Sequence, residues 1–331
     1  MRRYLTSIVI TLFFGLAAKA QEGIPVYFDY LADNYYLVYP SMAGIAEGTK
    51  IRLTARKQWF NVDEAPSLQT FNINSRVGSR SGVGGIIFND ANGYHSQTGF
   101  KATYAHHLQL AGDFRTLNQL SFGLSAGVIL SSLDETEFQS VIPDPVITGV
   151  KNTTSYFNVD LGASYNLFEF YAHAAILNIL GSGRDLYTAA EFDNLRRYLL
   201  SVGYVFGNST RIEPSILFQM TDFTKEKTID LNAKVYKDVS FGTVWAGLSY
   251  RRSFDGAQFQ TNGGFGEQRL QLFTPIIGVN VNRFLFSYNY SYQSGDIRFD
   301  NGGFHQITLG YEFGQSDQGK RYDCYCPAAN N

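Results

Sequence analysis

Paired histidines and clustered glycines are the first residues of this chain whose spacing suggests chemistry. His106 and His107 are adjacent in a segment with strand-like alternation. Neighbouring strand residues point to opposite faces of a sheet, so the two rings cannot chelate one metal ion together. Gly82, Gly84 and Gly85 are spaced like part of a phosphate-binding loop, but no helical pattern follows and no Lys-Ser/Thr completes the motif. Neither group predicts a catalytic or cofactor site.

A membrane-embedded serine hydrolase is the enzymatic alternative. It would need a serine, a histidine and a polar orienting group that converge on one face. The chain has 5 histidines and many serines, yet it contains no nucleophile-elbow motif. We therefore expect a protein that is not an enzyme and that has no catalytic residue, no cofactor and no metal centre.

Charged residues of the predicted strands lie on one face, which predicts a polar interior. They are Lys101, Asp160, Arg211, Glu213, Asp230, Lys234 and Glu312. Charges in such an interior need partners or water. Two interpretations follow, a salt-bridged and plugged interior or an open conduit. We expect the plugged interior, with residues 21–48 as the plug, because an open lumen of this size would leak.

The two cysteines, Cys324 and Cys326, are separated by one residue near the C-terminus. A disulfide between them would be strained across so short a span. Three interpretations stay open: a tail without a special role, a disulfide with a periplasmic partner protein, and a metal site that includes Asp323.

Alternation with a period of two residues runs through the chain and predicts the strands that position these groups. The stretch FLFSYNYSYQ places rings on one face and mostly small or polar residues on the other. In a membrane barrel the apolar face contacts lipid and the polar face lines the lumen. We interpret the rings as part of a lipid-facing aromatic girdle: Phe284, Phe286, Tyr288, Tyr290 and Tyr292.

Roughly fourteen segments of about ten residues have the length that a tilted membrane strand needs. They span 49–60, 68–77, 82–89, 97–108, 118–130, 154–166, 168–176, 195–206, 210–220, 227–236, 240–251, 268–281, 283–293 and 304–313. The predicted fold is therefore all-β, a transmembrane up-and-down antiparallel β-barrel of about 14 strands.

The connections between these segments alternate in length. The long ones are 61–67, 90–96, 131–153, 177–194, 221–226, 252–267 and 294–303, and the others are tight turns apart from 109–117. Outer-membrane barrels have long loops outside and short periplasmic turns, and an even strand number leaves both termini in the periplasm. Loops on a rigid scaffold often bind partners, so we expect recognition at 131–153, 177–194 and 252–267.

Two predicted strands contain prolines, Pro214 and Pro275. Proline cannot donate a ladder hydrogen bond, and a closed barrel has no edge strand to accommodate it. We therefore expect a bulge or a shifted strand boundary at each. The segments 240–251 and 268–281 also alternate poorly.

Composition and the N-terminus fit a secreted membrane protein. The net charge is −2 and only 17% of residues are charged, which argues against nucleic-acid binding. Residues 1–20 carry two arginines, a short apolar stretch and an A-x-A site, typical of a signal peptide cleaved after Ala20. The expected division of the chain is 1–20 signal peptide, 21–48 periplasmic or lumenal segment, 49–313 outer-membrane barrel and 314–331 periplasmic tail.

Several blocks of the sequence resemble one family of bacterial proteins. They are YYLVYPSMAG (35–44), RKQWFNVDEAPSLQTFNI (56–73), GVGGIIFNDANGYHSQTGFKATYAHHLQL (82–110), LSFGLSAGV (120–128), FSYNYSY and GGFHQITLGYEF. In order and spacing they are similar to the PorP/SprF family of Bacteroidota outer-membrane proteins. The departures are Ser41-Met42, where the family tends to have an alanine and an aromatic residue, and the cysteine-containing tail.

The resemblance implies a component of the type IX secretion and gliding-motility system. Such members are barrels that assist the secretion or surface attachment of a partner cargo, often a large adhesin, and some act with periplasmic ring components. The expected partners are thus the cargo, type IX components and outer-membrane lipid. The alternative function is an outer-membrane channel or hydrophobic-solute transporter, and a membrane hydrolase is the third.

Overall fold

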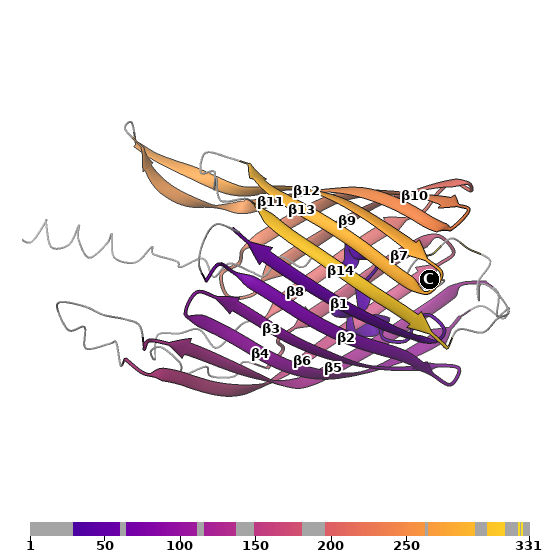
Figure 1. Cartoon of the computed structure of the whole chain (residues 1–331), viewed down its shortest axis with the longest axis horizontal. Coiled ribbons are helices and arrows are strands. Elements are labelled where there is room, and N and C mark those ends of the chain that lie inside the picture. The colour runs from indigo at the N-terminus through magenta and orange to yellow at the C-terminus, as the bar shows by residue number, and fades with distance from the viewer. Residues whose placement is uncertain are drawn as a thin grey trace, which may run out of the picture.

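The fold is a single closed β-barrel with a short segment of chain inside it (Figure 1). The computed structural model describes residues 29–59, 64–110, 116–136, 149–180, 196–261, 264–294, 303–314, 324 and 326. No helix in these ranges is long and apolar enough to cross a membrane.

Each of the 14 strands pairs antiparallel with its neighbours in sequence, and β1 pairs with β14 to close the ring. The strands are β1 (Thr49–Gln58), β2 (Ser67–Val77), β3 (Ser81–Asn92), β4 (His95–Gln109), β5 (Asn118–Asp134), β6 (Lys151–Leu167), β7 (Phe170–Leu177), β8 (Arg197–Tyr204), β9 (Thr210–Thr221), β10 (Lys227–Val239), β11 (Gly242–Thr261), β12 (Gly264–Val281), β13 (Phe284–Ser294) and β14 (Phe304–Phe313). The predicted barrel of about 14 strands is confirmed.

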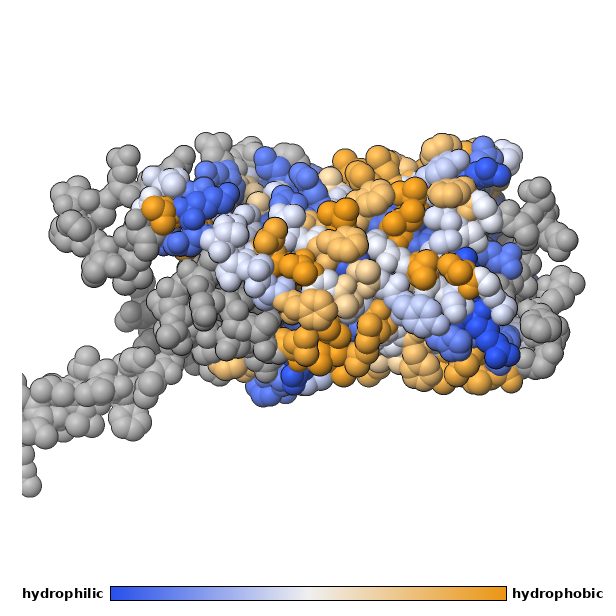
Figure 2. Space-filling view, turned by 90° about the horizontal axis from the view of Figure 1, so that it is seen from below, coloured by the Kyte–Doolittle hydropathy of each residue, from blue (hydrophilic) through white to orange (hydrophobic). Residues whose placement is uncertain are grey.

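The two faces of the wall differ as the alternation predicts. Along β5, Phe122, Leu124 and Val128 are exposed outward, whereas Ser121 and Ser125 at alternate positions are buried inside. Figure 2 shows a band of apolar side chains across the wall, with hydrophilic side chains toward both ends. A wall that is apolar outside and polar inside is the arrangement of an outer-membrane barrel.

Two predicted long connections are wrong. β3 and β4 are separated only by Gly93 and Tyr94, inside the predicted loop 90–96. β11 and β12 stay paired as far as Thr261 and Gly264, so most of the predicted loop 252–267 is strand. Aspartate, glycine and alanine at 255–257 lower the strand propensity of this stretch, but the pairing of β11 with β12 compensates. The predicted connection 221–226 corresponds to the described turn 222–226 between β9 and β10. The remaining long connections lie partly outside the described residues.

The two strand prolines disrupt pairing without a bulge or a boundary shift, contrary to the prediction. Pro214 keeps its pairing with Ala233 of β10, while the β8–β9 ladder stops at Ser215 and resumes in the same register at Ile212. Pro275 likewise pairs with β11, and the β12–β13 ladder skips it in constant register. Because each proline lacks an N–H group, one of its two ladders is interrupted locally: β8–β9 at Pro214 and β12–β13 at Pro275.

The segment inside the barrel consists of three short 3-10 helices and the turns between them: η1 (Asp29–Ala32), η2 (Tyr35–Leu37) and η3 (Pro40–Met42). Residues 31–46 are buried except for the partly exposed Leu37. We call residues 29–48 the lumenal segment. In Figure 1 it is the indigo ribbon within the ring of strands.

The lumenal segment explains why two strands alternate poorly. Leu272 and Ile276 of β12 and Trp245 of β11 face inward, and each is only 1% exposed. They belong to one buried apolar cluster with Leu31 of η1. These strands therefore carry apolar residues on both faces, one for lipid and one for the segment, which removes the period-two contrast.

Candidate functional site

The contacts between the lumenal segment and the wall form the most elaborate site in the described part of the chain. At its C-terminal part, η3 lies against inward-facing glycines. A Cβ atom on Gly123 would lie 2.2 Å from the carbonyl carbon of Pro40, and one on Gly82 would lie 2.0 Å from the Ala43 oxygen. Both distances are far below van der Waals contact. The glycines of β3 and β5 thus let the backbone of the segment touch the wall.

Hydrogen bonds fix the same part of the segment. The Gly44 N–H donates to Asn74 Oδ1 at 3.0 Å, and the hydroxyls of Ser41 and Ser164 lie 2.5 Å apart. His107 Nε2 lies 3.0 Å from the Ala43 carbonyl oxygen, which identifies it as the N–H donor. His107 therefore points into the lumen and binds the segment there. We call these contacts of residues 40–44 the glycine anchor.

The N-terminal part of the segment is held by charge. Lys234 Nζ of β10 lies 2.9 Å from Asp33 Oδ1 of the segment and 3.2 Å from Glu213 Oε2 of β9. The side chains of all three are at most 3% exposed. A buried lysine between two carboxylates is compensated on both sides, as burial of charge requires.

Tyrosine hydroxyls complete this network. Tyr35 and Tyr171 donate to Glu213 Oε1 at 3.0 and 2.6 Å, and Tyr236 donates to Glu213 Oε2 at 2.7 Å. Burial raises the pKa of Tyr35, so its hydroxyl stays protonated and remains a donor. We call the contacts of Asp33, Tyr35, Glu213 and Lys234 the charged anchor.

Other predicted lumen charges also have partners inside the barrel. Lys101 Nζ lies 2.6 Å from Asp160 Oδ2, Arg251 binds Asp230 with two hydrogen bonds of 2.5 and 2.6 Å, and Arg52 pairs with Glu312. Asp33, Arg52 and Arg251 are among the charged partners that sequence analysis did not identify, as is Asp238, which lies 2.6 Å from Arg211. The alternation of β1 and β11 was the available signal for the two arginines, whereas nothing in the sequence links Asp33 to Lys234.

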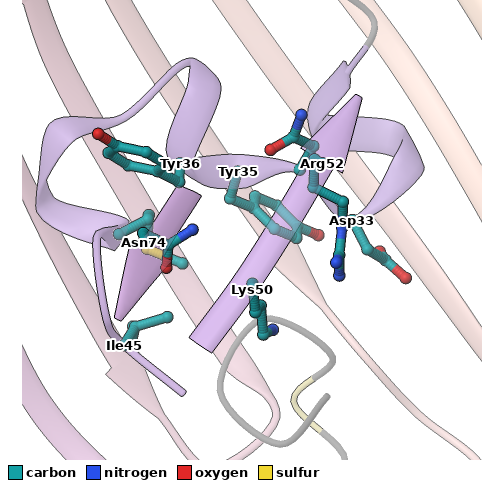
Figure 3. A pocket seen from close by; sticks show the side chains of 9 residues that line it. Asp33, Tyr35, Tyr36, Ile45, Lys50, Arg52 and Asn74 are labelled. Carbon is teal, nitrogen blue, oxygen red and sulfur yellow. The ribbon is translucent and has the colours of Figure 1, made fainter. Parts of the chain in front are cut away.

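A small cavity remains between the lumenal segment and β1. Asp33, Tyr35, Lys50, Arg52 and Asn74 are among its lining residues (Figure 3). The cavity volume is about 20 Å³. A cavity of this size holds one water molecule but no solute. This cavity therefore offers no passage or binding site for a solute.

The predicted girdle residues lie on the outer face of β13. Phe284, Phe286 and Tyr292 are exposed by 63%, 44% and 44%, and Tyr288 and Tyr290 are partly exposed. Tyr288 shares a 2.7 Å hydrogen bond with His305 Nδ1 of the neighbouring strand β14. Their contact with lipid stays a prediction.

The two cysteines are both buried, at 4% and 1% exposure, and Cys326 Sγ lies 4.0 Å from Asn166 Oδ1 of β6. A disulfide between either thiol and a partner protein would therefore require this part of the tail to move, and it stays a prediction. Ala20, Asp323 and residues 137–148 of the predicted recognition loop 131–153 lie outside the described residues.

The closed wall, its apolar outer band and its polar lumen define the class of an outer-membrane β-barrel that holds a segment of its own chain. The chain belongs to the PorP/SprF family, because the family model described as "Type IX secretion system membrane protein PorP/SprF" matches residues 19–311.

Solved structures with a similar wall are distant in sequence. The CymD monoaromatic hydrocarbon channel has 11% identity and a TM-score of 0.49, with 82% of this chain and 90% of that chain covered. Omp33 of Acinetobacter baumannii has 8% identity and a TM-score of 0.44 over 82% and 100% of the two chains. CdiB from the same organism has 10% identity and a TM-score of 0.43, and 81% of this chain spans 60% of CdiB. No curated protein sequence matches the chain.

Proposed function

We propose that this protein is a sealed, non-enzymatic outer-membrane barrel of the type IX secretion system that helps to export a secreted cargo protein, such as an adhesin, and to hold it at the cell surface. Family membership supports the link to secretion. One observation favours attachment of cargo at the surface over conduction through the lumen. The lumenal segment is buried inside the barrel and is held there by the charged anchor and the glycine anchor.

The proposed orientation follows from the topology. β1 begins and β14 ends at the same end of the barrel. The connections at this end include the tight turns 78–80, 168–169 and 240–241. In outer-membrane barrels the short turns face the periplasm. The opposite end, which carries the loops after β5 and β7 and the β11–β12 hairpin, would then face the exterior and bind the cargo.

The experiment is deletion of the gene in the native bacterium, followed by quantitative mass spectrometry of surface-exposed proteins. We expect one or a few large secreted proteins to be lost from the surface and restored by the wild-type gene. An unchanged set of surface proteins would contradict the proposal. A changed uptake of small solutes with an unchanged surface would instead favour a transporter.

A further inference from the structure

The hairpin of β11 and β12 extends beyond the ring of paired strands, and Figure 1 shows it in orange at the upper left. Pairing of β11 with β10 ends at Ser253, and pairing of β12 with β13 ends at Gln271. Beyond a register shift between Arg252 and Gly256, residues 256–261 pair only with residues 264–269 among the described strands. We call these two arms the ribbon. Each arm is about 20 Å long.

The free edge of β11 can be distinguished from that of β12. The turn before β10, residues 222–226, is described, and none of it forms a ladder with β11. The chain after β13 continues into residues 295–302, which lie outside the described part. The segment that follows the β11 edge in the ring is thus described, and no described residue pairs with residues 256–261 from that side. The same cannot be stated for the edge of β12, so we consider only the edge of β11.

The direction of each N–H group on this edge follows from the pairing. Thr261 and Gly264 pair across a two-residue connection, so they exchange both backbone hydrogen bonds. Hydrogen-bonded and non-hydrogen-bonded pairs alternate along an antiparallel ladder. Phe259 therefore also bonds β12, whereas the N–H and C=O groups of Gln258 and Gln260 point away from the ribbon.

Such an edge is a template for another strand. Natural edge strands are usually protected by lysine, proline or a covering element, but residues 256–261 contain neither lysine nor proline. A two-stranded ribbon is also only marginally stable in water, and a third strand stabilises it. Extended segments commonly add to exposed sheet edges, with main-chain hydrogen bonds supplying affinity.

We propose that the ribbon binds an extended segment of the cargo protein, which adds as a strand to the edge of β11 at Gln258 and Gln260. This inference rests on the proposed function, because the cargo is the partner. The recognised chemistry is a polypeptide backbone with donors and acceptors at every second residue and without proline at the paired positions. Cargo would thus be held outside the barrel, beside a lumen that stays closed.

The experiment replaces the outward N–H groups without changing those that face β12. Proline is tolerated where an edge N–H faces solvent, so Gln258→Pro with Gln260→Pro keeps the ribbon and removes two donors. Gln258→Ala with Gln260→Ala is the matched control that loses both side chains and keeps both donors. The readout is surface retention of the proteins that the deletion strain loses.

We expect at least a tenfold loss of retention in the proline variant and wild-type retention in the alanine variant. If the deletion strain loses a surface protein that the proline variant still retains, strand addition is wrong and the proposed function stands. If the deletion strain loses none, the proposed function fails.

A second measurement covers the case in which the proline variant does not fold. A photo-crosslinking amino acid at position 258 of an otherwise unchanged chain should give an adduct with the lost surface protein, and one at position 124 on the outer wall should not. An adduct only with a second copy of this chain, or none, overturns the inference.

Discussion

The lumenal segment is held in two different ways along its short length. Its first part, at Asp33 and Tyr35, is bound by a buried lysine, a carboxylate and hydroxyls from β7, β9 and β10. Its second part, residues 40–44, lies directly on glycines of β3 and β5 and is fixed by hydrogen bonds from β2, β4 and β6.

The difference concerns what each anchor tolerates. In the charged anchor the desolvation of each ion is offset by its partners, so removal of one ion leaves the others uncompensated. In the glycine anchor the fit depends on the absence of a Cβ atom, so addition of a single carbon disrupts it. The first anchor should thus be sensitive to neutralisation of charge and the second to side-chain volume.

Loss of the central lysine should have the largest effect. We expect Lys234→Met to lower the free energy of unfolding by about 3–5 kcal/mol, because Asp33 and Glu213 would be left as buried carboxylates without a counter-charge. Lys237→Met, at an exposed lysine of the same strand, is the matched control. Urea unfolding in detergent micelles measures both, and equal stabilities would show that the charged anchor is unimportant.

Addition of a methyl group to the glycine anchor should come next. The Cβ of Gly123→Ala would overlap the backbone of Pro40, at an expected cost of about 1–3 kcal/mol. Gly85→Ala adds the same atom where the nearest neighbour is 3.9 Å away, so it should be nearly neutral. The same unfolding assay compares them, and a neutral Gly123→Ala would contradict the described contact.

The hydroxyl of Tyr39, between the two anchors, should contribute less. It donates to Ser201 at 2.8 Å, and Tyr39→Phe should cost about 1 kcal/mol. Tyr204→Phe, on the outer face at 46% exposure, serves as the control. An effect of Tyr39→Phe as large as that of Lys234→Met would mean that the network is not centred on charge.

Tyrosine ionisation should affect the segment only at high pH. Burial raises the pKa of Tyr36, so the folded chain retains a proton that the unfolded chain loses above about pH 10. Stability from this group is therefore complete at neutral pH and declines as pH rises beyond about 10. Tyr36→Phe should flatten that decline in a pH series of unfolding curves, and an identical slope would exclude the contribution.

The wall was predictable from the sequence because each strand carries its own signal. Phe122, Leu124 and Val128 alternate with small residues along β5, and this pattern needs no knowledge of neighbouring strands. The wall of β11 and β12 was harder to predict because Leu272 and Ile276 pack against the segment from the lumenal face. Apolar residues on both faces of a barrel strand were thus a signal of lumenal packing that could have been used.

The site itself depends on contacts that periodicity does not encode. Asp33 and Lys234 are 201 residues apart in the sequence. Asp33 belongs to no strand, so the period-two alternation does not predict which way its side chain points. The ribbon was missed for a similar reason. It begins with Gly256 and Ala257, which have low strand propensity. The pairing of residues 256–261 with β12 makes this arm a strand.

Electrical recording from the full-length protein in planar lipid bilayers tests the central claim most directly, namely that the lumenal segment seals the barrel. We expect no steady conductance from the wild-type chain and channel openings from Lys234→Met, in which the charged anchor is lost. A stable open conductance of the wild-type protein would contradict the account.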